Sequence, residues 1–465
     1  MNEGIGMELE GIDLGDQRLN QRSIRVLETL YANPEASINA ACNGWGDTLA
    51  AYRLFDNTAV QPEKVLTPHI QKTRQRIRQH NVILIVQDTT ELDFSRHAPT
   101  DARCLDKPTR FGFYDHTYLA VTPDRLCLGV VGGEQHDRSP ESLGKKLQRK
   151  ALPIEEKESF RWLTGYRQAV EVAKDCPTTK IVSVADREAD IYDIFVEAQE
   201  QGHLANFIIR AKEPRSTLVP NPEAGPSVYR KVRDEVRASE VRVRRTIELS
   251  QTPKRAARQA ELEIRAISVT VRPPRARPHL PTVAYNVVLV EEINGPGDGT
   301  DVSWLLITTL PIDTAEQILL VIDYYTARWT IEVFFRVLKT GCKVEEIQLE
   351  TLARVKNCLA FYKIIAWRVM YLTFLNRECP ELPCTAAFDD CEWQTVWRVV
   401  KKEPLPSKPP SLGEFMKLIA GLGGYNNRPK EPPPGPQVIW TGLRRMADFA
   451  IAWAAFQQIN EPTCV

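Results

Sequence analysis

The chain has 465 residues, 43% hydrophobic and 26% charged, and its 60 basic and 60 acidic side chains give a formal net charge of zero. This length exceeds one ordinary core, so we expect two to four domains of a soluble globular protein. No run of about 18 apolar residues and no signal peptide is apparent, which predicts a cytoplasmic protein with no membrane partner. Zero net charge argues mildly against a nucleic-acid partner unless the charge is segregated along the chain.

The cysteines and histidines follow no metal-binding pattern. Ten cysteines are scattered without a C-x-x-C pair, and the seven histidines include no H-E-x-x-H motif. Free thiols in a reducing compartment are therefore expected rather than a disulfide framework or a zinc site. Neither a G-x-x-x-x-G-K-[ST] loop nor a G-x-G-x-x-G turn is present, which argues against a nucleotide-driven enzyme.

The N-terminal segment 14–55 has a helical pattern, with one helix in LGDQRLNQRSIRVLETLYANP and a shorter one in DTLAAYRLFDN. Arg18, Arg22 and Arg25 recur every three or four residues and form a basic stripe opposite the apolar residues Leu19, Val26, Leu27 and Leu30. The stripe fits either a solvated amphipathic face or a phosphate-binding one.

A buried strand is predicted in NVILIVQD, after a basic helix at 71–79. Its β-branched run ends at Asp88, and a carboxylate at the mouth of a buried strand is placed for metal binding. Glu91 and Asp93 follow closely and are alternatives.

A second buried strand, TTKIVSVAD, ends at Asp186. Between the two we expect strands at 116–121 and 126–131, joined by a turn at Pro123-Asp124, and a helix from about Glu155 to Asp175. Glu188 and Asp190 are alternatives to Asp186, although acids in a first helical turn commonly complement the helix dipole. A helix and a fifth strand, ANFIIRAK, follow. This order of elements is that of a ribonuclease-H-like α/β domain.

Positive charge is concentrated between Arg210 and Arg277, where 17 Lys or Arg face 8 Asp or Glu, a local balance of +9. Four stretches here and just beyond alternate apolar and polar residues with period two, as antiparallel strands with one wet face do. They are EVRVRRTIELS, AELEIRAISVTVR, TVAYNVVLVEEI and SWLLITT. We therefore predict a β-sheet insertion between Asp186 and the next helix.

The stretch from Asp313 to Gly341 is predicted to be one helix, capped by Asp313 with Glu316 and ended by Gly341 in a left-handed conformation. Tyr325, Arg328, Glu332 and Lys339 fall on roughly one face of it, over about 21 Å. The same spacing also fits a solvated face with pairs such as Arg328–Glu332, worth about 0.3–0.5 kcal/mol each.

The spacing Y-(2)-R-(3)-E-(6)-K in this stretch resembles the signature of the insertion-sequence-four family of DDE transposases, which includes the transposon-five transposase. The resemblance implies a catalytic triad of Asp88, Asp186 and Glu332. Oxygen ligands of this kind select Mg²⁺, with Mn²⁺ as substitute, and two ions about 3.5–4 Å apart can act on a phosphoryl group.

The resemblance also implies DNA-binding residues. Tyr325, Arg328 and Lys339 match residues that grip phosphates, and Trp304 matches a position that holds a flipped base, although a strand Trp is also commonly core. The segments GDQRLNQR and AAYRLFDN are similar in sequence to the family's end-recognition domain, which favours DNA contacts by Arg22 and Arg53. Arg210 and Lys212, at the start of the basic segment, are further DNA-binding candidates.

Five regions are expected: a helical DNA-binding domain (1–70), a catalytic core in two parts (71–211 and 303–375), a β-sheet insertion (212–302) and a helical dimerisation domain (376–465). The C-terminal segment resembles the family's dimerisation helices, although a self-packing core fits it equally well. The expected function is cut-and-paste transposition in a bacterial cytoplasm, at the nucleoid, by a homodimer that pairs two double-stranded DNA ends and cleaves them through a hairpin. The alternatives are a ribonuclease-H-like nuclease without strand transfer, and a catalytically silent DNA-binding regulator.

Overall fold

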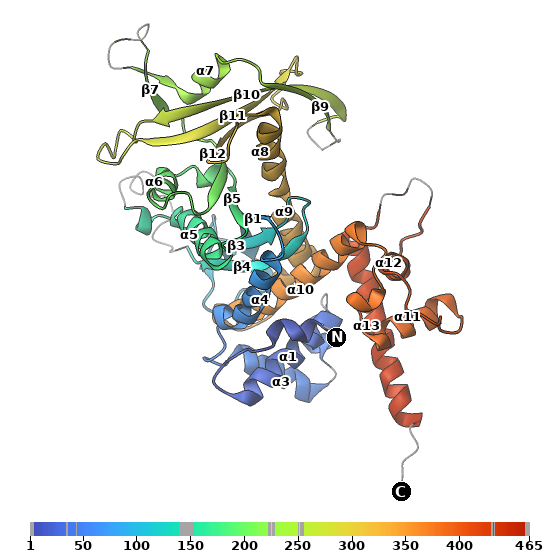
Figure 1. Cartoon of the computed structure of the whole chain (residues 1–465). Coiled ribbons are helices and arrows are strands. Elements are labelled where there is room, and N and C mark those ends of the chain that lie inside the picture. The colour runs from blue at the N-terminus through green and yellow to red at the C-terminus, as the bar shows by residue number, and fades with distance from the viewer. Residues whose placement is uncertain are drawn as a thin grey trace.

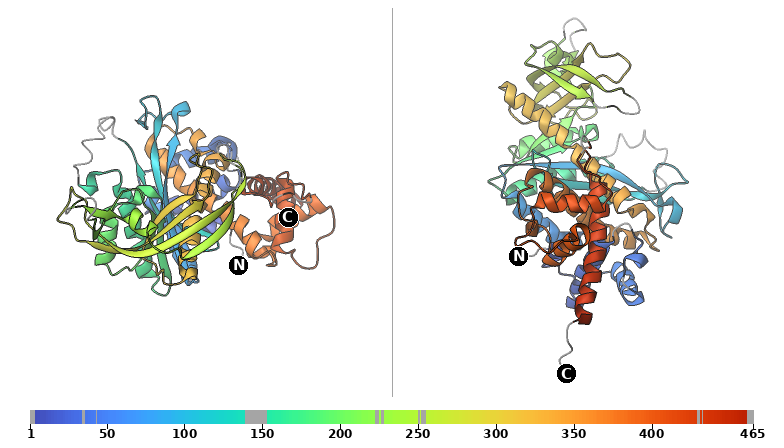
Figure 2. Two further views of the ribbon diagram at one scale, coloured as in Figure 1. Left: turned by 90° about the horizontal axis from the view of Figure 1, so that it is seen from above. Right: turned by 90° about the vertical axis from the view of Figure 1, so that its right-hand side faces the viewer.

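The computed structural model describes residues 4–33, 36–42, 44–138, 153–221, 225, 228–249, 251, 255–428, 431 and 433–460. Helical regions at the two ends of the chain flank one large mixed sheet (Figure 1). The first helices lie at the bottom of that view, the insertion lies at the top, and the C-terminal helices stand to one side. The view from above in Figure 2 shows the same lateral placement of the C-terminal helices.

The N-terminal region is helical, as expected. It comprises η1 (Ile5–Leu9), α1 (Gln17–Ala32), α2 (Ile38–Ala41), α3 (Trp45–Phe55) and α4 (Pro62–Ile77). Asp16 caps α1 by accepting the Arg18 N–H, which satisfies one of the free donors of the first turn. The apolar stripe of α1 is buried, and Arg18 and Arg25 on the other side are exposed. The amphipathic pattern is therefore confirmed.

The core strands form the centre of the sheet. They are β1 (Val82–Asp93), β2 (Arg103–Cys104), β3 (Phe111–Val121), β4 (Cys127–His136), β5 (Lys180–Ala185) and β6 (Asn206–Arg210). Strands β1, β5 and β6 are parallel, whereas β3 is antiparallel to both β1 and β4. The helices between them are η2 (Ser95–His97), η5 (Ile154–Glu156), α5 (Phe160–Asp175), η6 (Arg187–Ala189) and α6 (Tyr192–Glu200).

Strand β1 is longer than the sequence indicated, and the prediction that it ends at Asp88 is wrong. The parallel pairing with β5 stops at Val86–Val184, but β1 continues against β3, where Asp88 is opposite Thr117. The antiparallel partner supplies backbone hydrogen bonds beyond the point where β5 ends. Asp88 therefore lies inside a strand, level with the carboxyl end of its neighbour.

The insertion continues the core sheet rather than forming a separate one. Its elements are β7 (Ser216–Pro220), β8 (Tyr229–Lys231), α7 (Val232–Arg237), β9 (Val243–Leu249), β10 (Arg258–Val271), β11 (Val283–Ile293) and β12 (Ser303–Thr308). The strand order is β2-β3-β1-β5-β6-β12-β11-β10-β7-β8, with β4 beside β3 and β9 beside β10. Strand β12 pairs with both β6 and β11, so it joins the two parts.

The stretch expected to be one helix has an interruption. It consists of α8 (Ala315–Ala327), α9 (Trp329–Arg336) and a π-helical turn (Val337–Gly341). Arg328 keeps helical angles between the helices, but its N–H bonds to the Tyr325 carbonyl three residues back. The capping box is formed by Thr314 and Gln317, not by the acids predicted. Lys343 rather than Gly341 is left-handed, at φ 48°.

The C-terminal region contains η9 (Val344–Glu346), α10 (Leu352–Glu378), η10 (Cys384–Ala386), α11 (Asp390–Lys401), α12 (Leu412–Leu422) and α13 (Pro436–Asn460). Helix α10 is long and apolar enough to cross a membrane, yet 78% of its most apolar window is buried inside the protein. It is a core helix that spans the base of the sheet (Figure 1). The nine cysteines in the described part of the chain are free thiols, as expected.

Both faces of the sheet are covered. Leu84 and Val86 of β1 pack into one apolar cluster with α9 and α10, and Ile83 and Ile85 pack into a second with α5 and α6. The alternation follows from the two-residue period of a strand. The sheet is therefore a rigid, doubly covered platform, and its carboxyl edge is where side chains can face a ligand.

Candidate functional site

Three carboxylates lie near the carboxyl edge of the sheet, where it faces α9. Asp88 lies in β1, Asp186 directly follows β5, and Glu332 is in the first turn of α9. Burial is the largest effect on the Asp88 carboxyl, and together with the charges of Asp186 and Glu332 it raises the pKa from 3.8 to about 6. Asp88 lies level with the end of β5, and Asp186 directly follows that strand, so the two aspartates share this edge of the sheet.

Arg328 connects two of these carboxylates. Its guanidinium donates from Nη1 to Asp88 Oδ2 at 2.7 Å and from Nη2 to Glu332 Oε1 at 2.8 Å. The Arg328 side chain is only 10% exposed, against 20% for Asp88 and 38% for Glu332. Burial alone would lower the pKa of Arg328, but the Asp88 carboxylate and its other neighbours raise it. Arg328 is therefore a permanent cation inside the acidic cluster.

Tyr325 and Trp304 form an aromatic pair beside Arg328. Their ring centroids are 5.8 Å apart at an interplanar angle of 61°, an edge-on contact. Burial raises the pKa of Tyr325, and the positive charges of Arg328 and Arg210 oppose that rise. Trp304 is half-buried and packs against the apolar core.

Lys339 lies further along, on the π-helical turn. Its Nζ is 3.2 Å from Glu345 Oε1, and the same carboxylate oxygen accepts the Asp93 backbone N–H at 2.9 Å. Lys339 therefore pairs with an acid other than the three carboxylates. Lys212 is exposed on the loop after β6, and Arg210 donates to the Ser303 carbonyl at 3.2 Å.

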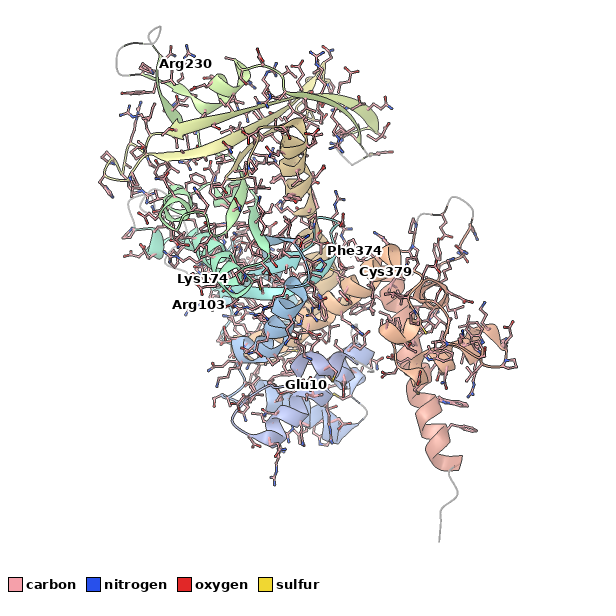
Figure 3. All side chains as sticks on the ribbon, viewed as in Figure 1. Glu10, Arg103, Lys174, Arg230, Phe374 and Cys379 are labelled. Carbon is pink, nitrogen blue, oxygen red and sulfur yellow. The ribbon has the colours of Figure 1, made fainter. Side chains whose placement is uncertain are left out.

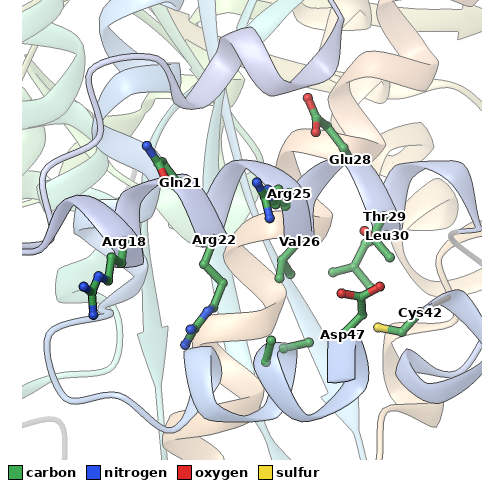
Figure 4. A pocket seen from close by; sticks show the side chains of 12 residues that line it. Arg18, Gln21, Arg22, Arg25, Val26, Glu28, Thr29, Leu30, Cys42 and Asp47 are labelled. Carbon is green, nitrogen blue, oxygen red and sulfur yellow. The ribbon is translucent and has the colours of Figure 1, made fainter. Parts of the chain in front are cut away.

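The N-terminal candidates lie apart from this cluster. Arg22 lines a hollow of about 610 Å³ between α1 and α3, and Figure 4 shows Arg18 and Arg22 extending from α1 into it. Arg25 and Asp47 also border the hollow. Arg53 is exposed on α3 and is not part of its lining.

The four alternative acids each have another partner. Glu91 and Asp93 both pair with Arg110, and Glu188 pairs with Arg161 at 3.0 Å. Asp190 is fully buried and pairs with Arg215. Each of these contacts ties the carboxylate to a cation outside the cluster of Asp88, Asp186 and Glu332.

A polar layer behind Asp88 has no recognisable sequence signal. Thr89 Oγ1 accepts from Arg161 Nε at 2.9 Å and contacts His116 Nδ1 at 2.8 Å, while His116 Nε2 lies 3.2 Å from Gln87 Oε1. Burial lowers the pKa of His116 well below 6.5, so the ring is neutral. The layer fixes the strand on which Asp88 sits. The run QDTT is uniformly polar, so it has no period that could have indicated the layer.

The donor set of the cluster fits a hard divalent cation. Three carboxylates against one guanidinium leave an excess of negative charge, and all the donors are oxygen. Across the described ranges, no group of three Asp, Glu, His or Cys side chains is already close enough to hold a metal ion. Arg328 lies between Asp88 and Glu332, so metal binding requires its side chain to withdraw.

Ion pairing neutralises part of the basic segment 210–277. In the described part of the segment, at least eight cations form ion pairs with five acids outside the segment and one inside it; the acids are Asp190, Asp193, Glu291, Glu292, Asp323 and Glu263. Subtracting the five outside acids reduces the balance of +9 to +4. The segregated charge is real but smaller than the composition implied.

Three family descriptions match consecutive parts of the chain. "Transposase DNA-binding" matches residues 2–60, "Transposase DDE domain" matches 164–367, and "Transposase Tn5 dimerisation domain" matches 364–459. With the mixed α/β sheet and its flanking helices, these matches define the class as a DDE transposase. The dimerisation match narrows the assignment: the chain belongs to the Tn5-like DDE transposases. Asp186 and Glu332 lie within the matched DDE domain, and Asp88 precedes it.

A solved structure is also similar over most of the chain. It is the cryo-EM structure of the piggyBac transposase synaptic complex with hairpin DNA. The identity is 9%, the alignment covers 99% of this chain and 79% of that one, and the TM-score is 0.37.

Proposed function

We propose that the protein is a cut-and-paste DNA transposase that cleaves the ends of its own element and joins them to target DNA. The observation that carries the proposal is the bridge of Arg328 between Asp88 and Glu332, with Asp186 at the end of the neighbouring strand β5, in a chain of the DDE transposase family. The nearby alternative acids have other partners, which supports this choice of three.

Asp88, Asp186 and Glu332 would hold Mg²⁺, or Mn²⁺ in its place. A divalent ion bound there would activate the attacking hydroxyl and stabilise the leaving oxygen in an in-line displacement. Arg328, released from the two carboxylates, is then placed to bind a phosphate of the DNA strand. Arginine suits this exchange because its planar fork fits carboxylate and phosphate equally well.

A hairpin intermediate is the proposed route to double-strand cleavage. Closing a hairpin bends the terminal base pairs sharply, and a base that leaves the stack can regain about 1–3 kcal/mol on an aromatic ring. Trp304, whose ring meets that of Tyr325 edge-on, would present such a ring to the DNA end. Arg210 and Lys339 would bind the phosphates on either side.

The proposed division of the chain is that given by the sequence, with DNA-end recognition in residues 1–70, the catalytic core in 71–211 and 303–375, the insertion in 212–302 and dimerisation in 376–465. Arg22 and Arg53 would contact the DNA end and Lys212 the strand near the insertion. The working unit would be a dimer on two paired ends, active at the nucleoid in a bacterial cytoplasm.

The test is an incubation of the purified protein with Mg²⁺, the DNA that flanks its own gene and a target plasmid. We expect nicks at the element ends, then hairpin ends, then joined products. Nicks without hairpins or joined products would identify a nuclease without strand transfer. Binding without any nicking, in either Mg²⁺ or Mn²⁺, would identify a silent DNA-binding regulator.

A further inference from the structure

A hollow of about 230 Å³ opens at the carboxyl end of β6 and lies outside the cluster described above. It is lined by the loop 211–215, the segment 231–234 and Leu305 of β12. Because β5 and β6 are parallel, their carboxyl ends share one edge of the sheet, and Asp186 follows β5 at that edge. The hollow is thus on the same edge as the catalytic carboxylates, one strand further along.

The floor of the hollow is rigid. The Asp190 side chain is fully buried, and its Oδ2 accepts the backbone N–H groups of Lys212 and Glu213, each at 2.7 Å. Arg215 Nε donates to the other oxygen at 3.0 Å. These bonds fix the loop and neutralise Arg215, and they leave the Lys212 side chain exposed at the rim.

Cations at the hollow retain positive charge. Lys231 Nζ donates to the Ser216 hydroxyl at 3.0 Å and the Pro214 carbonyl at 3.3 Å, which are neutral acceptors. Arg233 shares the single carboxylate of Glu291 with Arg237, so two guanidinium groups face one negative charge.

Two exposed acids, Glu213 and Asp234, also border the hollow. Further cations gather beside it. Arg230 is exposed on β8, at the insertion end labelled in Figure 3. Arg272, stacked 3.8 Å above the Tyr229 ring, donates its backbone N–H to the Ser216 carbonyl. Much of the charge that ion pairs leave in the basic segment is therefore gathered here.

Ser303 connects the hollow to the catalytic cluster. Its carbonyl accepts from Arg210 Nη2 at 3.2 Å, and its hydroxyl accepts from Arg233 Nη1 at 3.1 Å. Trp304 directly follows Ser303, and its ring contacts that of Tyr325, whose carbonyl accepts the Arg328 backbone N–H. A row of cations therefore runs from Arg328 through Arg210 to Arg233. DNA phosphates repeat along a strand, so a row of this kind matches a strand that continues past the cleavage position.

We propose that the hollow binds a backbone phosphate of the DNA strand that leaves the catalytic cluster, with Lys212, Lys231 and Arg233 as its ligands. The proposal rests on the proposed function, because it takes the strand at Arg210 to be a transposon end. Contacts to phosphate are independent of base sequence, so the hollow adds affinity and strand direction rather than sequence selection.

The test measures how the affinity of the full-length protein for a duplex of its element's end varies with salt. Lys231→Gln keeps donors for the Pro214 carbonyl and Ser216 hydroxyl and removes the charge, and Lys212→Gln alters an exposed side chain that cannot prevent folding. Each lost phosphate contact should reduce the slope of log affinity against log salt by about 0.9. Arg275→Gln, an exposed cation of the same segment outside the hollow, is the matched control and should leave the slope unchanged.

Unchanged slopes for both lysine variants, or an equal fall for Arg275→Gln, would overturn the proposal. Replacing single phosphates of the duplex by neutral methylphosphonates provides a second readout. At one position, the neutral replacement should weaken DNA binding by the wild-type protein but not by the Lys231→Gln variant. The absence of any such position would also overturn the proposal. Loss of strand joining by the wild-type protein would count against the proposed function alone, because both readouts measure binding.

Discussion

Replacing Glu8 by Gln is expected to weaken the attachment of the N-terminal region to the catalytic core. Glu8 is 8% exposed, accepts two bonds from Arg76 at 3.0 and 3.2 Å, and has an oxygen 2.5 Å from His69 Nδ1. His69 Nε2 accepts the Val130 N–H at 3.0 Å, so the ring is the neutral tautomer with its proton on Nδ1. The cluster therefore connects η1 with α4 and β4.

The expected loss of stability in Glu8→Gln follows from the pKa of Glu8. Burial alone would raise this pKa, but the bonds and charges of His69 and Arg76 lower it from 4.5 to about 2. A difference of this size corresponds to about 3 kcal/mol of stability, at about 1.4 kcal/mol per pH unit. A lowered carboxyl pKa stabilises above pH 4.5, and this contribution is lost as the pH falls from 4.5 towards 2. Burial also lowers the pKa of His69, so the unfolded chain gains protons there below about 6.5 and stability falls in the same direction.

The assay is urea unfolding of the wild-type protein, Glu8→Gln and Glu10→Gln between pH 7 and pH 3, followed by tryptophan fluorescence. Trp367 reports on the cluster because the Arg76 guanidinium lies 4.4 Å from its ring. Glu8→Gln should lose about 3 kcal/mol at neutral pH, and the deficit should shrink on acidification. Glu10 has an exposed pair with Lys72 at 3.2 Å, and its replacement should cost less than about 1 kcal/mol. Equal losses for the two variants, or a deficit that does not vary with pH, would refute the reasoning.

Two further predictions concern the DNA reaction. Trp304→Ala should still nick the DNA but accumulate nicked product, because hairpin formation is slowed several-fold. Trp304→Phe keeps a stacking ring and should restore hairpin formation. Equal loss of nicking and hairpin formation on sequencing gels would assign Trp304 to the core. Phe456→Asp should lose paired-end complexes in gel shifts yet keep single-end binding, because Phe456 is 57% exposed on α13 within the matched dimerisation domain. Intact paired-end complexes would contradict this prediction.

Much of the fold could be predicted because local patterns determine it. Period-two runs identified β9 to β12, and β-branched runs identified β1 and β5, since strands buried on both faces are continuously apolar. The end of β1 could not be predicted, because residues 89–93 are held by pairing with β3, a contact of long sequence separation. The cap of α8 was placed one residue early for a related reason, because neighbouring polar residues compete for the same role.

The sequence proposes the acids of the site but not their surroundings. Asp88, Asp186 and Glu332 are chosen from expected strand ends, helix spacing and a family resemblance, and their assignment as the catalytic acids stays a prediction. The Arg328 bridge to Asp88 crosses 240 positions of sequence, and no spacing rule reports it. The same limit applies to the basic segment. Its charge is partly neutralised by acids such as Glu291 and Asp193, which lie outside it in sequence and meet it only in the folded chain.

The most direct test of the central claim is single-turnover cleavage of an end duplex in Mg²⁺ by Asp88→Asn, Asp186→Asn and Glu332→Gln, with end binding measured on the same preparations. Glu188→Gln is the matched control, since Glu188 is an acid two residues from Asp186 that pairs with Arg161. If the three carboxylates form one metal site, each of the first three variants should lose cleavage by several orders of magnitude while binding the end nearly as the wild type does, and Glu188→Gln should cleave. Normal cleavage by any of these three variants, or loss of cleavage in Glu188→Gln alone, would contradict the assignment of Asp88, Asp186 and Glu332 as the metal-binding acids.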